Sequence, residues 1–214
     1  GMSDMKEKYQ RQSNAVIKGL SLGNNDINLI NQYTMEPLKA EDVFVFQLAI
    51  SNNRIDRDYE KISKASLENM IELFKGRTMI KDHAWKSDNQ VARIYDVEIK
   101  TTNEVLEDEN YCELIAKVYM LNSEANQHLI SEIKAGIKKE CSIGFGISGA
   151  ICSICGVDNA KTACQHWWGK EYEGNLCFFT LIVKDAYEVS FVAVPANKDA
   201  GTTKDYGQNK TQDE

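Results

Sequence analysis

The amino-acid sequence predicts an α+β protein whose core is mainly antiparallel β-sheet. Six or seven runs of strand length are rich in β-branched and aromatic residues, and two longer segments carry apolar residues at helical spacing. Strands interrupted by only two helices favour an antiparallel core with the helices packed onto it. The chain has 214 residues, 43% of them hydrophobic, which is enough for one substantial domain to bury a core without disulfides.

The predicted elements follow one another in a simple order. Residues 1–40 are polar, rich in Asn, Gln and Lys, and are expected to form a loosely held N-terminal arm. The strands are predicted at 43–50, 78–80, 91–99, 111–120, 141–151, 176–183 and 187–194, each a short apolar run between polar turn residues. The expected organisation is an arm over 1–40, a domain over 41–200 with a Cys-rich insertion at 152–177, and a polar tail at 201–214.

The two helices are predicted from their periodicity and their ends. In the first, over 63–74, Ser63 or Ser66 can cap the N-terminus, and Gly76 lies just past the last apolar residue, Phe74. In the second, over 123–137, the apolar residues share one face and Gly136 can end the helix early.

Composition argues against several classes of protein. The chain carries 25 Lys and Arg against 32 Asp and Glu, a net charge of −7, which disfavours a main role in neutralising nucleic-acid phosphates. No run approaches the roughly 18 apolar residues of a membrane span, and the N-terminus has no apolar signal-peptide core. We therefore expect an intracellular protein that binds neither nucleic acid nor membrane.

Residues 142–149 alternate strictly between Ser or Gly and larger apolar side chains. Because successive strand residues point to opposite faces, Ser142, Gly144 and Gly146 share one face. Glycine in a strand usually marks a place where another backbone or a ligand comes close. This face is either a wall where two sheets touch or bend, or an open cleft that exposes Ser142 as a nucleophile.

A nucleophilic serine needs a base within hydrogen-bond reach, and the chain has three histidines. His128 lies in the middle of the second helix, away from its apolar face, and is expected at the surface. His166 belongs to a cysteine cluster. His83 follows an apolar strand in a polar loop, where catalytic groups concentrate, although a surface or structural histidine is the alternative.

The base in turn needs a partner that fixes its tautomer. Glu188 lies at the start of an apolar strand, where a carboxylate is costly to bury unless a cationic or hydrogen-bonding partner meets it. His83 is one candidate partner, and Lys184, Arg93 and solvent are the others.

Three segments together resemble the prohead (capsid maturation) proteases of tailed phages, a group related to herpesvirus assemblins. The segments are Asp82-His83, Cys141-Ser142-Ile143-Gly144-Phe145-Gly146 and Glu188-Val189-Ser190-Phe191-Val192-Ala193-Val194-Pro195-Ala196-Asn197. Their order and spacing agree with that group over about residues 43–200.

The resemblance implies a serine endopeptidase that cleaves phage scaffold and capsid proteins inside the prohead, in the cytoplasm of the bacterial host. Ser142 would be the nucleophile on a β-barrel strand, His83 the general base, and Glu188 the counterpart of the third histidine of assemblins. Backbone N–H groups of residues 195–199 would supply the oxyanion donors. The resemblance also implies a homodimer, because assemblin-like proteases often require dimerisation.

Four of the six cysteines lie within residues 152–177. Cys152, Cys155, Cys164 and His166 offer three sulfurs and one nitrogen, the ligand set of a closed structural zinc site. Cys177 is the alternative to His166 as fourth ligand, and reduced cysteines without metal are the alternative to zinc. A closed four-ligand site leaves no position for water, so we expect the zinc to hold the insertion together and to take no part in chemistry.

Two other functions compete with the protease. One is a non-catalytic structural or interaction protein of a phage particle whose zinc loop is a docking module, which a wide separation of Ser142 and His83 would favour. The other is a zinc ribbon that binds nucleic acid. It is disfavoured because residues 152–177 hold two Lys and no Arg against three acidic residues.

Overall fold

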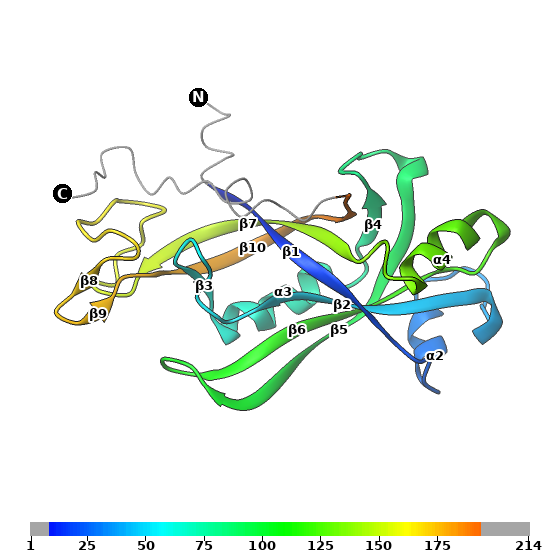
Figure 1. The fold of residues 1–214 in the computed structure, drawn as a ribbon, viewed down its shortest axis with the longest axis horizontal. Helices are drawn as coiled ribbons and strands as arrows, with labels where there is room; N and C mark the ends of the chain where they lie inside the picture. Colours follow the sequence, from blue (N-terminus) through cyan, green and yellow to red (C-terminus); the bar gives the residue numbers. More distant parts are fainter. Residues whose placement is uncertain (1–8, 194–214) are drawn as a thin grey trace.

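The computed structural model describes residues 9–193, which form an α+β fold around a closed β-barrel (Figure 1). The helices are α2 (Asp26–Ile30), α3 (Lys64–Phe74) and α4 (Gln127–Lys134). The strands are β1 (Gln10–Gly19), β2 (Val43–Asn52), β3 (Glu60–Ile62), β4 (Thr78–Lys81), β5 (Gln90–Val105), β6 (Asn110–Leu121), β7 (Glu140–Cys152), β8 (Glu171–Tyr172), β9 (Asn175–Leu176) and β10 (Phe179–Phe191). Within these residues, no helix is long and apolar enough to cross a membrane.

The barrel consists of seven strands in the order β10-β4-β5-β6-β2-β1-β7, and β7 pairs back onto β10 to close it. Among the described residues the barrel pairings are antiparallel except for β4 with β10, which is parallel. The short β3 adds to β10 in parallel, and β8 and β9 form a separate two-stranded sheet. The predicted α+β class with a mainly antiparallel barrel core and flanking helices is confirmed.

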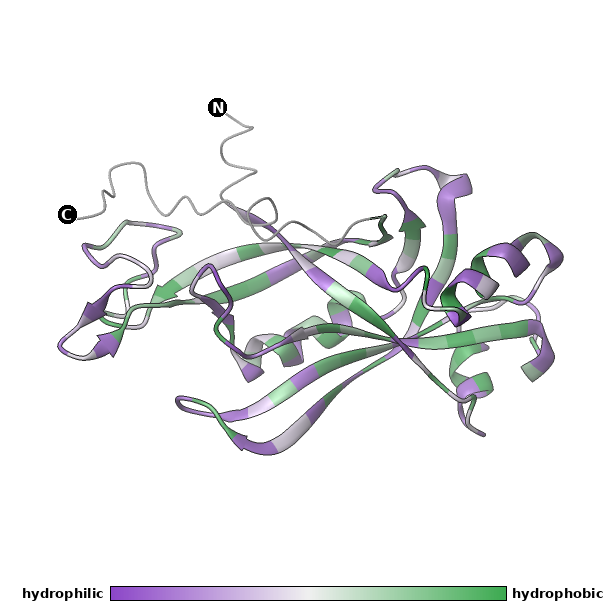
Figure 2. Cartoon of the chain, viewed as in Figure 1, coloured by the Kyte–Doolittle hydropathy of each residue, from purple (hydrophilic) through white to green (hydrophobic). Residues whose placement is uncertain are grey.

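The core lies inside the barrel because apolar and polar residues alternate along the strands, as the colours of Figure 2 show. In β7, Ile143, Phe145 and Ile147 belong to this core. Helix α3 packs against β10 and contributes buried residues such as Phe74. Its N-terminus is capped as predicted, since the Ser63 hydroxyl accepts the backbone N–H of Ser66 at 3.2 Å.

Two predicted elements differ from the structure. The separate strands expected at 176–183 and 187–194 are one strand, β10, which remains paired with β7 through three register shifts. Such bulges break the alternation of side chains, so the sequence pattern splits in two. Helix α4 is shorter than predicted: residues 124–126 form a 3₁₀ turn before it, and Gly136, with φ of 77°, follows its end.

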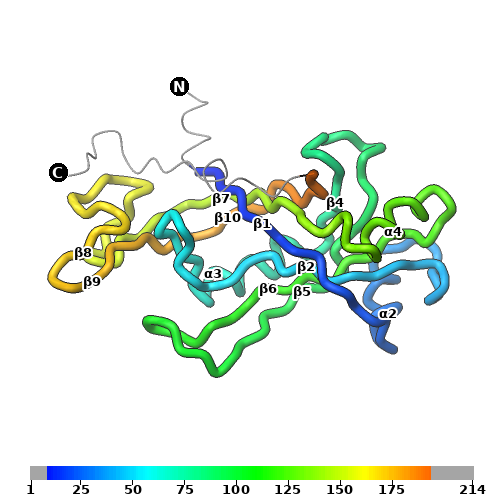
Figure 3. Tube along the Cα trace, viewed as in Figure 1, coloured from blue at the N-terminus to red at the C-terminus, as the bar shows by residue number. Residues whose placement is uncertain are grey.

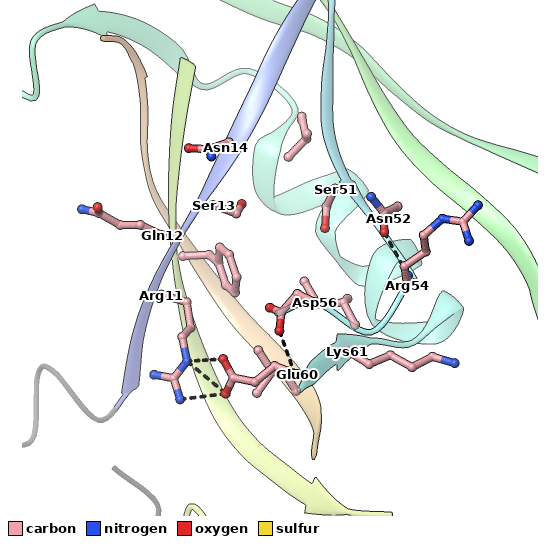
Figure 4. A pocket seen from close by; sticks show the side chains of 14 residues that line it. Arg11, Gln12, Ser13, Asn14, Ser51, Asn52, Arg54, Asp56, Glu60 and Lys61 are labelled. Atoms are coloured by element: carbon pink, nitrogen blue, oxygen red, sulfur yellow. Dashed lines mark hydrogen bonds and ion pairs between the residues drawn. The ribbon is translucent and has the colours of Figure 1, made fainter. Parts of the chain in front are cut away.

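The prediction of a loosely held arm over residues 1–40 is wrong for residues 10–19, which form the barrel strand β1. This strand pairs with β7 over residues 10–16 and with β2 over 16–19. Arg11 of β1 forms an ion pair with Glu60 of β3, Nε to Oε1 3.1 Å, with both side chains 1% exposed (Figure 4). The polar composition hid this strand because Gln12 and Asn14 face outward while Ala15 is buried.

The rest of that segment is also held against the barrel. In α2, Ile30 is fully buried, and the Asp26 carboxylate accepts a hydrogen bond from the Tyr95 hydroxyl at 3.0 Å. Burial, with the Asp26 charge adding to it, raises the pKa of Tyr95. Residues 1–8 of the predicted arm and the predicted tail at 201–214 lie outside the described residues.

Candidate active site and metal site

His83 lies in the loop that follows β4, on a backbone that few residues adopt. Asp82 and His83 both have positive φ, 55° and 58°, in the left-handed region that disfavours side chains with a Cβ. The loop is held in place because Asp82 N–H donates to Phe191 O at 2.9 Å and the Asn89 side-chain amide donates to the carbonyls of Lys81 and Ala84. Strained conformations that the surroundings enforce are concentrated at functional sites.

Glu188 of β10 joins this loop to the barrel. Its Oε2 contacts Nδ1 of His83 and its Oε1 accepts the indole N–H of Trp85. An ionised carboxylate can only accept hydrogen bonds, so this contact requires the proton on Nδ1 of His83, and in the neutral imidazole Nε2 is then the acceptor. The Glu188 side chain is 9% exposed and the His83 side chain 46%, so the imidazole remains open to solvent. This is the arrangement in which a carboxylate orients a histidine base.

Ser142 lies on the same face of the sheet as Glu188. The β7–β10 register places Ser142 opposite Ser190 and Gly144 opposite Glu188. Directly opposed residues of an antiparallel pair share a face, and diagonal neighbours are about 7–8 Å apart at their Cα atoms. The register therefore brings the serine and the carboxylate into one neighbourhood although 46 positions separate them in the chain.

The hydroxyl of Ser142 is buried and takes part in no hydrogen bond among the described residues. Ser142 is 1% exposed and Ser190 is 0% exposed, and each Oγ lacks a partner. The structure thus joins His83 to Glu188 but forms no hydrogen bond between Ser142 and His83. In free enzymes such contacts are often long and tighten only when substrate binds.

The glycines of β7 make room for side chains of β10. A Cβ on Gly146 would lie 2.6 Å from the Tyr187 hydroxyl oxygen, and a Cβ on Gly144 would lie 3.5 Å from the Glu188 Cβ. The close approach expected from the sequence is therefore present, but here it is made by neighbouring side chains. Of the two alternatives for this face, the burial of Ser142 agrees with a wall and not with an open cleft.

An open cavity lies next to Glu188. It has a volume of about 270 Å³ and is lined by Trp85, Tyr187 and Glu188 together with Arg77 and Lys86. Pockets that combine apolar walls with a few polar groups are the usual place for a bound ligand or substrate side chain.

Cys141, next to Ser142, is not a competing nucleophile. Its side chain is fully buried in the barrel core. Burial, with the Glu140 charge adding to it, raises the pKa of the Cys141 thiol to about 12, so the thiol stays protonated at neutral pH.

The predicted metal ligands come together at one point. One donor atom from each of Cys152, Cys155, Cys164 and His166 lies within 4.8 Å of all the others. This cluster could hold a metal ion. Cys177, the alternative fourth ligand, is buried but does not belong to this set.

The surroundings of the cluster fit a bound metal. The Ile154 N–H donates to the Cys152 sulfur at 3.4 Å and the Asn159 amide donates to the Cys164 sulfur at 3.3 Å, which favours thiolates. Nδ1 of His166 is buried and has no hydrogen-bond partner among the described residues, so this nitrogen is free to coordinate.

The metal site and the His83 loop lie at separate ends of the barrel, as the positions of β8–β9 and β4 show (Figures 1 and 3). The residues that follow Cys152 fold into a compact loop in which Asp158 accepts the backbone N–H groups of Ala150 and Ala160. The cluster of Cys152, Cys155, Cys164 and His166 therefore lies in an insertion away from Glu188.

Sequence reasoning missed two residues that complete these sites. Trp85 orients Glu188 and Asn159 orients Cys164. Trp85 lies two residues after His83 in a polar segment, and this position is a signal that could have been used. In the structure Trp85 is 70% exposed. His128 is a surface residue as expected, paired with Glu132 one helical turn away.

No protein-family model matches the chain, and searches of curated proteins and of solved structures return no match either. The class of protein is therefore argued from the barrel and from the two sites.

Proposed function

We propose that this chain is a serine endopeptidase of the phage prohead protease type. The observation that carries the proposal is the contact of Nδ1 of His83 with Glu188, on the face of the sheet that also bears Ser142. The sequence resemblance links those same three residues in one catalytic arrangement.

In this reaction each residue has a defined role. Ser142 attacks the scissile carbonyl carbon, and Nε2 of His83 takes the proton that the hydroxyl loses. His83 then gives this proton to the leaving amine, and water hydrolyses the acyl-enzyme by the same steps. Glu188 stabilises the imidazolium and fixes the ring, and Trp85 is a positioning residue that holds Glu188. The oxyanion donors proposed at residues 195–199 lie outside the described residues.

The buried state of Ser142 sets a condition on this mechanism. Its hydroxyl must become accessible and approach His83 when substrate binds or when two copies of the chain associate. The substrates would be scaffold and capsid proteins within the prohead in the bacterial cytoplasm.

The test is peptide-bond cleavage by the purified chain, measured by mass spectrometry on a mixture of synthetic peptides. We expect cleavage that a fluorophosphonate abolishes and that a metal chelator, added briefly, does not. Absence of cleavage in every peptide and in the chain's own terminal segments would instead favour a non-catalytic interaction protein. The burial of the Ser142 hydroxyl favours that alternative.

We further propose that the cluster of Cys152, Cys155, Cys164 and His166 binds Zn²⁺. Three thiolates and an imidazole are a ligand set that zinc favours. Bound zinc would supply a cross-link within the insertion, and four protein ligands leave no coordination position for a reacting water.

Chain purified from cells grown with zinc is expected to contain one Zn²⁺ per molecule by elemental analysis. Cys155→Ser should lose most of the metal and lower the midpoint of thermal unfolding, because structural zinc contributes several kcal/mol to folding. Cys112→Ala is the control for zinc content alone, since Cys112 lies outside the cluster and is buried in the core, where its removal can lower stability by itself. Equal zinc content in the two variants would contradict the assignment.

A further inference from the structure

An apolar groove lies at the α4 end of the barrel, apart from both sites described above. It has a volume of about 370 Å³ and runs between the end of β1, the start of β2 and the segment that follows α4. Its apolar lining includes Ile17, Phe44, Phe46 and Ile133. Phe44 is only half-buried, so part of this lining is exposed to solvent.

Four lysines surround the groove: Lys18, Lys134, Lys138 and Lys139. Lys18 and Lys138 each have one carboxylate oxygen at 3.9 Å, from Glu113 and Glu132, at the outer limit of an ion pair. Ion pairs of this length between exposed groups contribute little and leave most of each charge available.

The other two lysines have no carboxylate within ion-pair distance among the described residues. Lys134 lies with its Nζ 5.5 Å from the centroid of the Phe44 ring, and both Lys134 and Lys139 are exposed. This face is thus locally positive in a chain whose net charge is −7.

The backbone that lines the groove is also uncovered at two glycines. A Cβ built on Gly19 or Gly136 would meet no atom within 4 Å. Ile137, beside the groove, is 70% exposed. Apolar surface that stays uncovered and is surrounded by one sign of charge is typical of a surface that binds a partner.

We propose that this groove docks an acidic segment of a partner protein that carries apolar anchor side chains. The lysines complement carboxylates, and the apolar lining complements the anchors. A concave apolar lining fits side chains better than phosphates, and the net negative charge of the chain opposes long polyanions such as nucleic acid. A concave surface is also unsuited to a lipid bilayer, which binds protruding apolar side chains.

The groove adjoins the strand that carries Ser142, because Lys138 and Lys139 directly precede β7. The docking proposal does not depend on protease activity, since it concerns binding alone.

The test is the fluorescence anisotropy of three labelled synthetic peptides of equal length, mixed with the full chain. The first alternates clusters of Leu and Glu, the second has Lys in place of Glu, and the third has Ser in place of Leu. We expect the Leu/Glu peptide to bind at least about tenfold more tightly than either of the others, and its affinity to fall as salt is raised.

Two variants locate the binding in the groove. Gly19→Leu fills the groove without strain, since Gly19 has no positive φ and space for a side chain. The double variant Lys134→Glu, Lys139→Glu reverses the charge. Each should weaken binding of the Leu/Glu peptide by at least about tenfold with unfolding midpoints unchanged. Lys161→Glu, an exposed lysine in the metal loop, is the control that should leave affinity unchanged.

Several outcomes would overturn the proposal. They are no binding of the Leu/Glu peptide, equal binding of the Ser/Glu or Leu/Lys peptide, and unchanged affinity in both groove variants. Tighter binding of double-stranded DNA or of anionic lipid vesicles than of the Leu/Glu peptide would assign the groove to another kind of partner and would also reject it.

Discussion

Replacing Ser142 by alanine is expected to abolish peptide-bond cleavage while leaving the fold intact. Loss of the nucleophile of a serine protease lowers kcat by about 10⁴-fold or more. Stability should be unchanged or slightly higher, because the Ser142 Oγ is buried without a hydrogen-bond partner and its removal relieves a desolvation cost of about 1 kcal/mol. The measurements are the cleavage rate and the unfolding midpoint of the same preparation.

Two serines serve as controls for that experiment. Ser148 lies on the same strand but is exposed, so Ser148→Ala should change neither activity nor stability. Ser190 is buried like Ser142, and neither hydroxyl has a hydrogen-bond partner within residues 9–193; Ser190 lies directly opposite Ser142 in the β7–β10 register. Ser190→Ala should match Ser142→Ala in stability but retain activity. Loss of activity in Ser190→Ala with retention in Ser142→Ala would contradict the assignment of the nucleophile.

Replacing Glu188 by glutamine is expected to lower kcat by about 10³–10⁴-fold with little change in KM. The amide is close in size to the carboxylate, but it carries no charge to stabilise the imidazolium and can hold His83 in the wrong tautomer. Trp85→Phe should have a smaller effect, about tenfold, because it removes one hydrogen bond to a carboxylate that His83 still contacts.

The control for these variants is Glu98→Gln, an exposed carboxylate on β5. It should leave kcat unchanged. If Glu188→Gln retained full activity, Glu188 would be a structural anchor for the loop that follows β4, and a different group would have to orient the base.

The class of fold was predictable because β2, β5, β6 and β7 are rich in β-branched and aromatic residues and are bounded by polar turns. Local pattern could not reveal β1, whose outward residues are polar and whose inward residues include Arg11. Arg11 is tolerated inside the barrel only because Glu60, 49 positions later, neutralises it. A compensation between distant residues leaves no periodic signal.

The two candidate sites differ in how completely the sequence predicted them. The spacing of the cysteines identified the metal cluster directly, since ligands that are close in sequence have little freedom to separate. His83 and Glu188 are 105 positions apart, and His83 was predicted only as one of several possible partners for the Glu188 carboxylate. Burial of Ser142 was not predictable, because the alternation over residues 142–149 fits both a wall between sheets and an open cleft.

The most direct test of the catalytic arrangement is to find which residue a fluorophosphonate modifies, by mass spectrometry of the digested chain. Reaction requires a serine hydroxyl that a nearby base activates. We expect a single adduct on Ser142 that is lost in His83→Ala and strongly reduced in Glu188→Gln. An adduct on another serine, equal labelling of Ser142 in His83→Ala, or no adduct under conditions in which the chain cleaves peptides would contradict the assignment.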